Sequence, residues 1–334
     1  VRVDRFEGKM GMFTLNHLEV HLRNNLLRLQ GGLRVEACVV SAEAEFLGQI
    51  PVEFAPLYTV VPQSEICALL ESPTDRYRAV LFSRKGCANS ALLTQQVLGY
   101  LQRHYPERFR YVDRTPVQRI VLNKADAILE AGSHKVKAGR VVLCTNGFTD
   151  HVVENSQGEP LISADTRWVK GNIGYMAAFV ETEQRKPDAL SFIRNTEIGG
   201  AKPYVYVTRR PHDVAGETTT LTCMGGPERP LEACEQYDLS TPFPGRILSE
   251  MDAQIRPLAQ PQRPPGTAYD YTWHGLMGYT QGGIRRIGAE PCNPVLLYNL
   301  GCNGVGFLPS VCGGERVSRI LAGEPLAPSI FDPK

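Results

Sequence analysis

Three glycines near the end of the chain stand where a strand-like run gives way to a helix-like one. The apolar run 295–297 precedes Gly301, Gly304 and Gly306, and an amphipathic stretch follows them. A strand, a glycine turn and a helix in this order can present backbone N–H groups to an anion or to a flat cofactor. The spacing G-x-x-G-x-G differs from the dinucleotide fingerprint G-x-G-x-x-G, and glycine turns before helices are common. A cofactor site and a simple turn both remain open on this pattern alone.

A second turn, of small polar residues, could serve the same chemistry. Cys144, Thr145, Asn146 and Gly147 follow the buried-type strand 141–143. Open α/β sheets bind their cofactors at the carboxyl edge of the strands, where such a turn places backbone against a ligand. A plain strand-to-turn transition explains the same residues equally well.

Tyrosine and arginine meet in the run PYVYVTRR. Tyr204 and Tyr206 alternate with Val205, Val207 and Arg209, which predicts an antiparallel strand with two different faces. Arginine grips carboxylates through two parallel hydrogen bonds, and tyrosine suits an amphipathic pocket. Ordinary packing at a solvated strand end is the competing interpretation.

Two histidines, His17 and His21, have the i, i+4 spacing of zinc-binding helices. The metalloprotease motif requires Glu directly after the first histidine, and Leu18 stands there instead. The neighbouring sequence offers no evident third ligand, so we expect a structural or surface pair and no metal. A metal-dependent hydrolase is nevertheless a distinct hypothesis that metal analysis would test.

Composition excludes several classes of function. The 334 residues include 36 basic and 35 acidic side chains, so no strong field favours nucleic acid. No apolar run approaches the roughly 18 residues of a membrane span, and no signal-peptide pattern opens the chain. Nine scattered cysteines, without a C-x-x-C pair, indicate reduced thiols and a cytoplasmic protein.

The elements that must position these residues alternate in type. Helices are predicted at 16–29, at 90–105 and from Pro244 to 258. Residues 50–83 read as strand-rich and irregular, and residues 168–226 read as an antiparallel sheet. The chain is therefore expected to be an α+β protein in which an α/β domain, assembled from separated segments, accompanies an antiparallel β-sheet domain.

Taken in order, these segments resemble the D-amino-acid oxidase / sarcosine oxidase superfamily of FAD-dependent oxidoreductases. RVVLCTNGFT resembles the strand beneath the adenosine half of FAD, and PYVYVTRR with TTTLTCMGGPE resembles the substrate-domain hairpin. The segment 269–323 is similar to the closing pattern W-x-G-x-x-x-x-T-P-D-x-x-P-x-I-G and the glycine turn that comes after it. The resemblance spans roughly residues 75–325 and is most specific in this last segment.

The resemblance implies a flavoenzyme that oxidises the C–N bond of an amine or amino acid by hydride transfer to flavin N5. It implies an FAD-binding domain at 1–49, 84–160 and 271–327, and a substrate-binding domain at 50–83 and 161–270. Implied substrate contacts are Tyr204, Tyr206, Arg209, Trp273 and His274. Implied FAD contacts are Val117, Cys144, Thr145, Asn146, Gly147, Gly301, Asn303, Gly304, Val305, Gly306, Phe307 and Leu308.

The sequence departs from the superfamily pattern at several positions. Residues 1–60 contain no strand followed by G-x-G-x-x-G, the loop that holds the FAD pyrophosphate. Leu308 stands where sarcosine oxidases have lysine, and the position of covalent flavin attachment is not a cysteine. We therefore expect the first FAD-binding segment to be missing, and FAD to bind this chain non-covalently and weakly, or not at all. A catalytically inactive remnant that acts as a binding or scaffold domain is the alternative.

Overall fold

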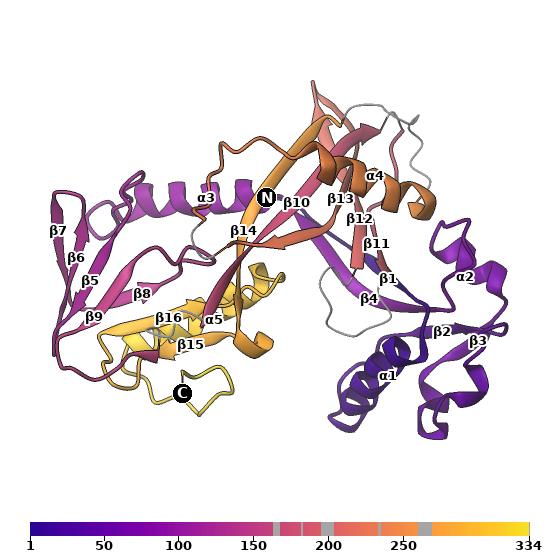
Figure 1. Ribbon diagram of the computed structural model, residues 1–334, viewed down its shortest axis with the longest axis horizontal. Helices are drawn as coiled ribbons and strands as arrows, with labels where there is room; N and C mark the ends of the chain where they lie inside the picture. Colours follow the sequence, from indigo (N-terminus) through magenta and orange to yellow (C-terminus); the bar gives the residue numbers. More distant parts are fainter. Residues whose placement is uncertain (163–167, 182, 195–203, 233–234, 260–268, 334) are drawn as a thin grey trace. The chain divides into compact units, whose positions relative to one another are not determined.

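The computed structural model describes residues 1–162, 168–181, 183–194, 204–232, 235–259 and 269–333, and it is a mixed α/β protein with three sheets (Figure 1). In chain order, the elements of the first half are β1 (Val3–Met12), α1 (Leu15–Gln30), β2 (Cys38–Ser41), η1 (Leu47–Gln49), η2 (Val52–Leu57), β3 (Thr59–Val61), α2 (Gln63–Leu69), β4 (Ala79–Ala88), α3 (Ser90–His104), β5 (Arg119–Leu122), β6 (Ala127–Ala131), β7 (His134–Ala138), β8 (Val141–Leu143) and β9 (Val152–Asn155). The second half contains β10 (Val169–Glu181), β11 (Asp188–Ile193), β12 (Tyr204–Val214), β13 (Glu217–Pro230), α4 (Gly245–Ala259), β14 (Tyr271–Thr280), η4 (Gln281–Gly283), β15 (Arg286–Ala289), β16 (Leu296–Leu300) and α5 (Phe307–Leu321).

The largest sheet has nine strands in the order β14-β10-β13-β12-β11-β1-β4-β2-β3. β11, β12 and β13 pair antiparallel, as the alternation in the sequence predicts. β1 lies between β11, with which it is parallel, and β4, with which it is antiparallel. The helices α1, α3 and α4 form where the hydrophobic periodicity places them.

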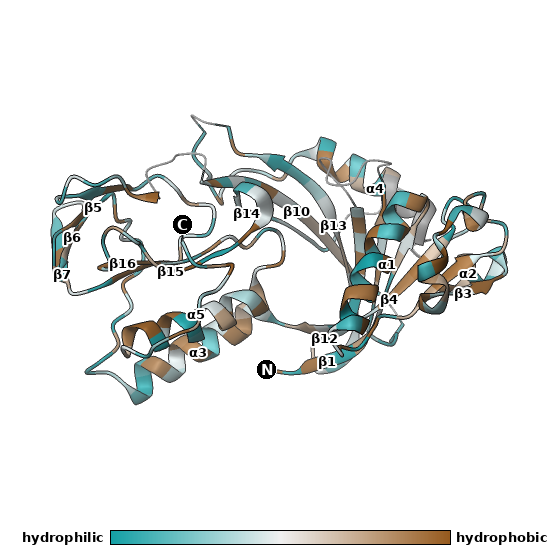
Figure 2. Ribbon diagram, turned by 90° about the horizontal axis from the view of Figure 1, so that it is seen from below, coloured by the Kyte–Doolittle hydropathy of each residue, from teal (hydrophilic) through white to brown (hydrophobic). Residues whose placement is uncertain are grey.

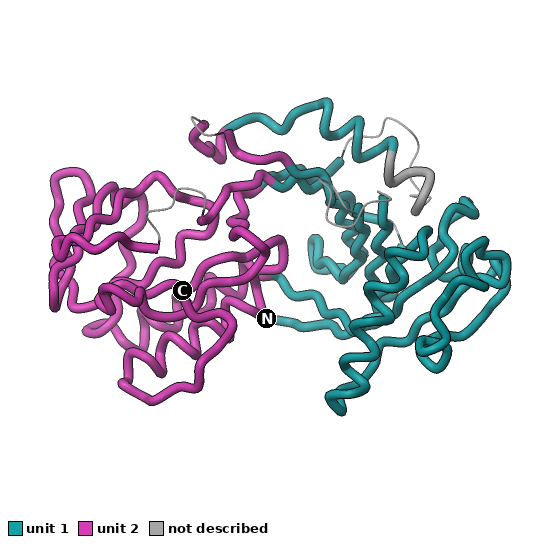
Figure 3. The backbone as a smooth tube through the Cα atoms, turned by 60° about the horizontal axis from the view of Figure 1, so that its bottom comes forward, with its two compact units in different colours: residues 1–89, 174–228, 241–274 teal, residues 90–173, 229–240, 275–334 magenta. Residues whose placement is uncertain are grey.

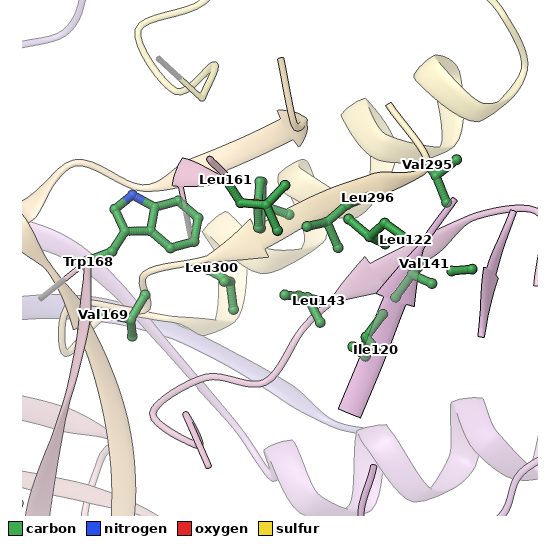
Figure 4. Packing of buried hydrophobic residues seen from close by; sticks show 12 residues of the cluster. Ile120, Leu122, Val141, Leu143, Leu161, Trp168, Val169, Val295, Leu296 and Leu300 are labelled. Atoms are coloured by element: carbon green, nitrogen blue, oxygen red, sulfur yellow. The ribbon is translucent and has the colours of Figure 1, made fainter. Parts of the chain in front are cut away.

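Two smaller sheets complete the fold. One has the order β15-β16-β8, with β16 parallel to β8 and antiparallel to β15. The other has the order β7-β6-β5-β9 and pairs β5 with β9 in parallel. A cluster of buried apolar side chains joins strands of both sheets (Figure 4). Its members include Ile120 and Leu122 of β5, Val141 and Leu143 of β8, and Leu296 of β16.

The chain folds into two compact units (Figure 3). Unit 1 comprises residues 1–89, 174–228 and 241–274, and unit 2 comprises residues 90–173, 229–240 and 275–334. Both units are built from separated segments. The expected domains place 1–49 with the flavin-binding segments, whereas the compact units group 1–89 with the antiparallel strands.

Unit 1 has a second core, on the face of the sheet beneath α1. Leu18 and Leu22 of α1 are buried there against Val40 and Leu81 of the strands. Figure 2 shows the resulting division of α1 into apolar and hydrophilic stripes. Thr14 caps this helix, because its side-chain oxygen accepts the backbone N–H of His17 at 3.4 Å.

The strand-rich reading of residues 50–83 is wrong for most of that segment. The chain there forms η2, the three-residue strand β3 and the helix α2 before β4 begins at Ala79. Pro51, Pro56 and Pro62 explain the difference, since proline has no N–H to donate to a sheet ladder. Pro62 instead stands at the N-cap of α2, with Glu65 in the first turn.

Candidate functional site

The two turns singled out in the sequence come together at one sheet edge of unit 2. β8 and β16 are adjacent parallel strands, with Val141 opposite Leu296 and Leu143 opposite Tyr298. Parallel neighbours end at the same edge, so the turn after β8 and the glycine turn after β16 leave the sheet side by side. This is the carboxyl edge, where α/β sheets present backbone to cofactors.

Asn146 joins the first turn to β14. Its side-chain Nδ2 donates to the carbonyl of Leu276 at 2.7 Å, and its Oδ1 accepts the N–H of Gly278 at 2.8 Å. The residue adopts a left-handed backbone conformation, with φ of 53°. Its amide therefore acts as an additional strand partner, which fixes the turn against β14.

Asn303 joins the glycine turn to β14 in the same way. Its N–H donates to the carbonyl of Gly278 at 3.1 Å, while its Oδ1 accepts the N–H of Thr280 at 2.9 Å. Its Nδ2 donates to the carbonyl of Gly283 at 2.8 Å, and its φ is 48°. Two asparagines thus clasp the end of β14 between the two turns.

The clasp brings backbone close to backbone, which glycine alone allows. A Cβ on Gly278 would come within 2.4 Å of the carbonyl oxygen of Asn146, and one on Gly147 within 2.8 Å of that of Met277. Gly304 has a φ of +77°, and a Cβ there would meet Tyr279 Oη at 2.7 Å. Gly306, by contrast, has an ordinary φ of −85°, and its Cβ would press on Cys302.

The helix α5 begins at this edge without a side-chain cap. Gly306 is its N-cap residue and offers no side chain, unlike Thr14 at the start of α1. The first N–H groups of a helix have no partner within it, so they favour an anion or a carbonyl oxygen there. The surrounding apolar side chains are exposed, with Val305 at 65%, Phe307 at 45% and Leu308 at 71%. Backbone donors beside exposed apolar groups suit a flat ring with a polar edge.

The other residues predicted to contact the cofactor include Thr145, Cys144 and Val117, whose positions give less information about a ligand. Thr145 is half-buried and Cys144 is exposed directly after β8. Val117 is half-buried and packs against the apolar cluster of β5, β8 and β16, ahead of β5. The side chain of Val117 is therefore part of the core of unit 2, and only its backbone is available to a ligand.

Tyr204 and Tyr206 lie together on one face of β12 in unit 1. Their ring centroids are 5.9 Å apart, and Tyr206 Oη lies 2.9 Å from Met176 Sδ on β10. The tyrosine crosses β13 above Gly225, where a Cβ would come within 2.5 Å of Tyr206 Oη. Burial raises the pKa of both tyrosine hydroxyls above the ordinary value.

Arg209 points to the opposite face and is only 4% exposed. Its Nη1 is 2.8 Å from Asp188 Oδ2, its Nη2 is 3.0 Å from Glu71 Oε2, and Glu181 lies 3.7 Å away. Burial raises the pKa of Asp188, and the charge of Arg209 opposes that shift. Arg209, predicted from the sequence to bind a substrate carboxylate, thus binds carboxylates of the protein itself.

Trp273 and His274 are neighbours on β14 and so face opposite sides of the sheet. His274 Nε2 donates to the carbonyl of Thr241 at 2.9 Å, and its ring lies 6.0 Å from that of Tyr175. Trp273 is 40% exposed and, by alternation, shares a face with Met176 and Tyr206. Of the five substrate candidates, the two tyrosines are in contact, and the tryptophan lies on their face.

The two histidines of α1 lie in different surroundings. His17 is buried, with its Nδ1 2.7 Å from Thr14 Oγ1 and its ring against Phe13. Burial lowers the pKa of half-buried His21. Within the described residues no group of three or more His, Cys, Asp or Glu side chains is arranged to hold a metal ion. The described helices also include none that is long and apolar enough to cross a membrane.

One family model matches most of the chain. The family model described as "FAD dependent oxidoreductase" (DAO) matches residues 25–320. The chain belongs to this FAD-dependent oxidoreductase family. A comparison with curated protein sequences finds no match.

Solved structures share the DAO fold at low sequence identity. Glycine oxidase from Geobacillus kaustophilus has a TM-score of 0.62 and 13% identity over 96% of this chain and 84% of its own. L-proline dehydrogenase from P. horikoshii has a TM-score of 0.66 and 13% identity, covering 99% and 76%. L-α-glycerophosphate oxidase from Mycoplasma pneumoniae, solved with FAD bound, has a TM-score of 0.58 and 11% identity, covering 98% and 78%.

The carboxyl edge of unit 2 fits the flavin of this FAD-dependent family. The uncapped start of α5 offers N–H donors, and Val305, Phe307 and Leu308 offer exposed apolar surface to a ring. The start of α1 does not offer uncapped N–H donors to the pyrophosphate in the same way, because Thr14 already caps that helix. Sequence reasoning missed Arg285, which donates to the glycine turn. It also missed the clasp, for which the Asn-Gly pairs at 146–147 and 303–304 were the available signal.

Proposed function

We propose that this chain binds FAD non-covalently at the carboxyl edge of β8 and β16 and oxidises the C–N bond of an amine or amino acid. The observation that carries the proposal is the paired arrangement of the two turns. Asn146 and Asn303 hold both of them against the end of β14, beside an uncapped helix and exposed apolar side chains. The family match over residues 25–320 supports FAD as the ligand.

When bound, FAD supplies the acceptor for a hydride from the carbon that bears nitrogen, and the substrate, having also lost an N–H proton, leaves as an imine that water hydrolyses. The residues of this chain bind and orient. Backbone N–H groups at the start of α5 stabilise negative charge that develops near them. Val305, Phe307 and Leu308 present apolar surface that excludes water from a ring placed on it.

The substrate contacts are proposed in unit 1, on the face of the sheet that carries the tyrosines. The ring centroids of Tyr204 and Tyr206 are 5.9 Å apart, and Trp273, 40% exposed, lies on the same face of the sheet. Aromatic faces attract cations and apolar groups, so this surface suits a protonated amine or its apolar substituent. Arg209 and His274 support it from the other side, through their bonds to Asp188 and Thr241. In this scheme unit 2 is the flavin-binding part and unit 1 the substrate-binding part.

Anaerobic reduction of bound flavin tests the function. The purified chain is saturated with FAD and mixed with simple amines, N-alkyl amino acids and primary amino acids. We expect at least one of them to bleach the visible absorbance of oxidised flavin, and the Gly304→Val variant to retain no flavin to bleach. Bound flavin that no amine reduces would favour the inactive-remnant alternative. A chain that takes up no FAD at any concentration would refute the cofactor assignment itself.

A further inference from the structure

Arg285 reaches the glycine turn from the segment between β14 and β15. Its Nη1 donates to the carbonyl of Gly301 at 2.7 Å, and its Nη2 donates to the carbonyls of Cys302, at 3.0 Å, and Val305. One guanidinium therefore donates hydrogen bonds to three carbonyl oxygens of the same short turn. Arginine suits this task because its donors form a rigid planar fork, whereas a lysine offers a single point of donation.

The charge of Arg285 is not neutralised where it lies. In the part of the chain that the structure describes, its hydrogen bonds go to the carbonyls of the turn, and it forms no ion pair with a carboxylate. Other arginines of this chain do pair, such as Arg316 with Asp332 and Arg319 with Glu324. The guanidinium thus leaves a net positive charge directly behind the turn that precedes α5.

The position is unusual for the pattern that this segment resembles. With Thr280 and Ile287-Gly288 aligned on T-P-D-x-x-P-x-I-G, Arg285 stands at the second proline. A proline there contributes neither charge nor a donor to the turn. Arg285 therefore departs from that pattern, and its role does not follow from the resemblance.

We propose that Arg285 is a positioning residue that sets the polarity of the glycine turn. It draws the carbonyls of Gly301, Cys302 and Val305 to one side and adds a positive charge to the N-terminal end of α5. The edge thereby favours a ligand group that is, or becomes, negatively charged. This inference rests on the proposed function, in which that group belongs to the flavin ring.

The test compares Arg285→Gln, which removes the charge, with Arg285→Lys, which keeps it. Arg319→Gln on the last turn of α5 changes the net charge equally, away from the turn, and serves as the control. The readouts are the ratio of dissociation constants for oxidised and reduced FAD, and the affinity of bound flavin for sulfite. Both respond to charge beside the ring, and the comparison of the Gln and Lys variants separates the charge from the hydrogen bonds of the guanidinium. Hydrogen exchange of residues 301–308 in the free chain reports the conformation of the turn.

We expect Arg285→Gln to weaken the binding of reduced FAD relative to oxidised FAD by about tenfold, equivalent to about 1.4 kcal/mol. The affinity of bound flavin for sulfite should fall by about the same factor. Arg285→Lys should keep the wild-type ratio within about threefold while exchange in the turn quickens, since one donor group replaces the fork. An unchanged ratio in a folded Gln variant would overturn the inference. If the Gln variant does not fold, the Lys variant decides. A ratio of the two dissociation constants that shifts against reduced FAD in the Lys variant, although the charge is kept, would overturn the inference. Failure of the wild-type chain to bind FAD at all would instead contradict the proposed function.

Discussion

Gly304 shows how one residue fixes the conformation of the whole turn. Its φ is +77°, and a Cβ at this position would lie 2.7 Å from Tyr279 Oη, so an alanine there meets both backbone strain and a steric clash. We expect Gly304→Ala to lower the free energy of unfolding by about 1–2 kcal/mol and to reduce FAD affinity. Denaturant unfolding and flavin titration measure the two effects.

Gly314 is the matched control on the same segment. It lies inside α5, and a Cβ there has nothing within 4 Å. Gly314→Ala should raise stability by about 0.5–1 kcal/mol, because alanine restricts the unfolded chain and favours the helix. Equal effects of the two substitutions would show that the conformation of the turn does not depend on Gly304.

The sequence predicts individual turns but not what their side chains bind. The Asn-Gly pairs at 146–147 and 303–304 indicate positive φ, and both asparagines have it. Their partners could not be predicted, because Asn146 bonds to residues 130 and 132 positions further along the chain. Arg209 illustrates the same limit, since the strand and its faces follow from alternation while Asp188 and Glu71 come from other elements.

At the scale of elements, β16 connects the core of unit 2 to the candidate site. Leu296 is fully buried in the cluster shared with β5 and β8. We expect Leu296→Ala to cost about 2–5 kcal/mol of unfolding free energy, through lost burial and a residual cavity. Val136 on β7 is 56% exposed, so Val136→Ala should cost less than about 0.5 kcal/mol. Similar costs for the two would contradict this placement of the core.

The helix α1 should make the stability of the chain depend on pH. Burial lowers the pKa of His21 from its ordinary value of 6.5, an effect that nearby Glu36 opposes and His17 reinforces. Below about pH 6.5 the unfolded chain therefore binds a proton that the folded chain excludes, and stability falls as the pH falls. His21→Asn should flatten part of this slope between pH 7 and 5, roughly the range in which histidine titrates.

The elements that sequence reasoning missed share a physical cause. β1 carries Asp4, Arg5, Glu7 and Lys9 among its apolar residues, so it shows no clean alternation, yet β4 and β11 pair with it on both sides. Long periodic helices such as α1 and α3 were predictable because their pattern is local. β1 was not, since its stability comes from two strands distant in sequence.

At the scale of the whole molecule, the resemblance rests on several segments in their order along the chain. The family match over residues 25–320 confirms it, and so does the mixed α/β fold shared with the solved oxidases and dehydrogenases. The grouping of segments into two units was harder to predict. Residues 1–49 join the antiparallel strands through β1, an element with no clear signal.

Weak flavin affinity remains a prediction for this chain. The candidate contacts at 144–147 and 301–308 serve a ring and its polar edge, while the described helix after β1 begins at its own Thr14 cap. Each missing hydrogen bond to a charged phosphate costs roughly 1.5–3 kcal/mol, so several of them reduce affinity by several powers of ten. Fluorescence titration with FAD should give a dissociation constant above the micromolar range. Submicromolar binding would mean that other residues hold the phosphates.

Hydrogen exchange with and without saturating FAD tests whether flavin binds at the two turns, because it locates the ligand on the chain. We expect slower amide exchange at residues 144–148 and 301–308, around the two clasped turns and the start of α5. We expect no change at the start of α1, where Thr14 already accepts the N–H of His17. Protection at the start of α1 with unchanged exchange at the two turns would contradict flavin binding at the turns.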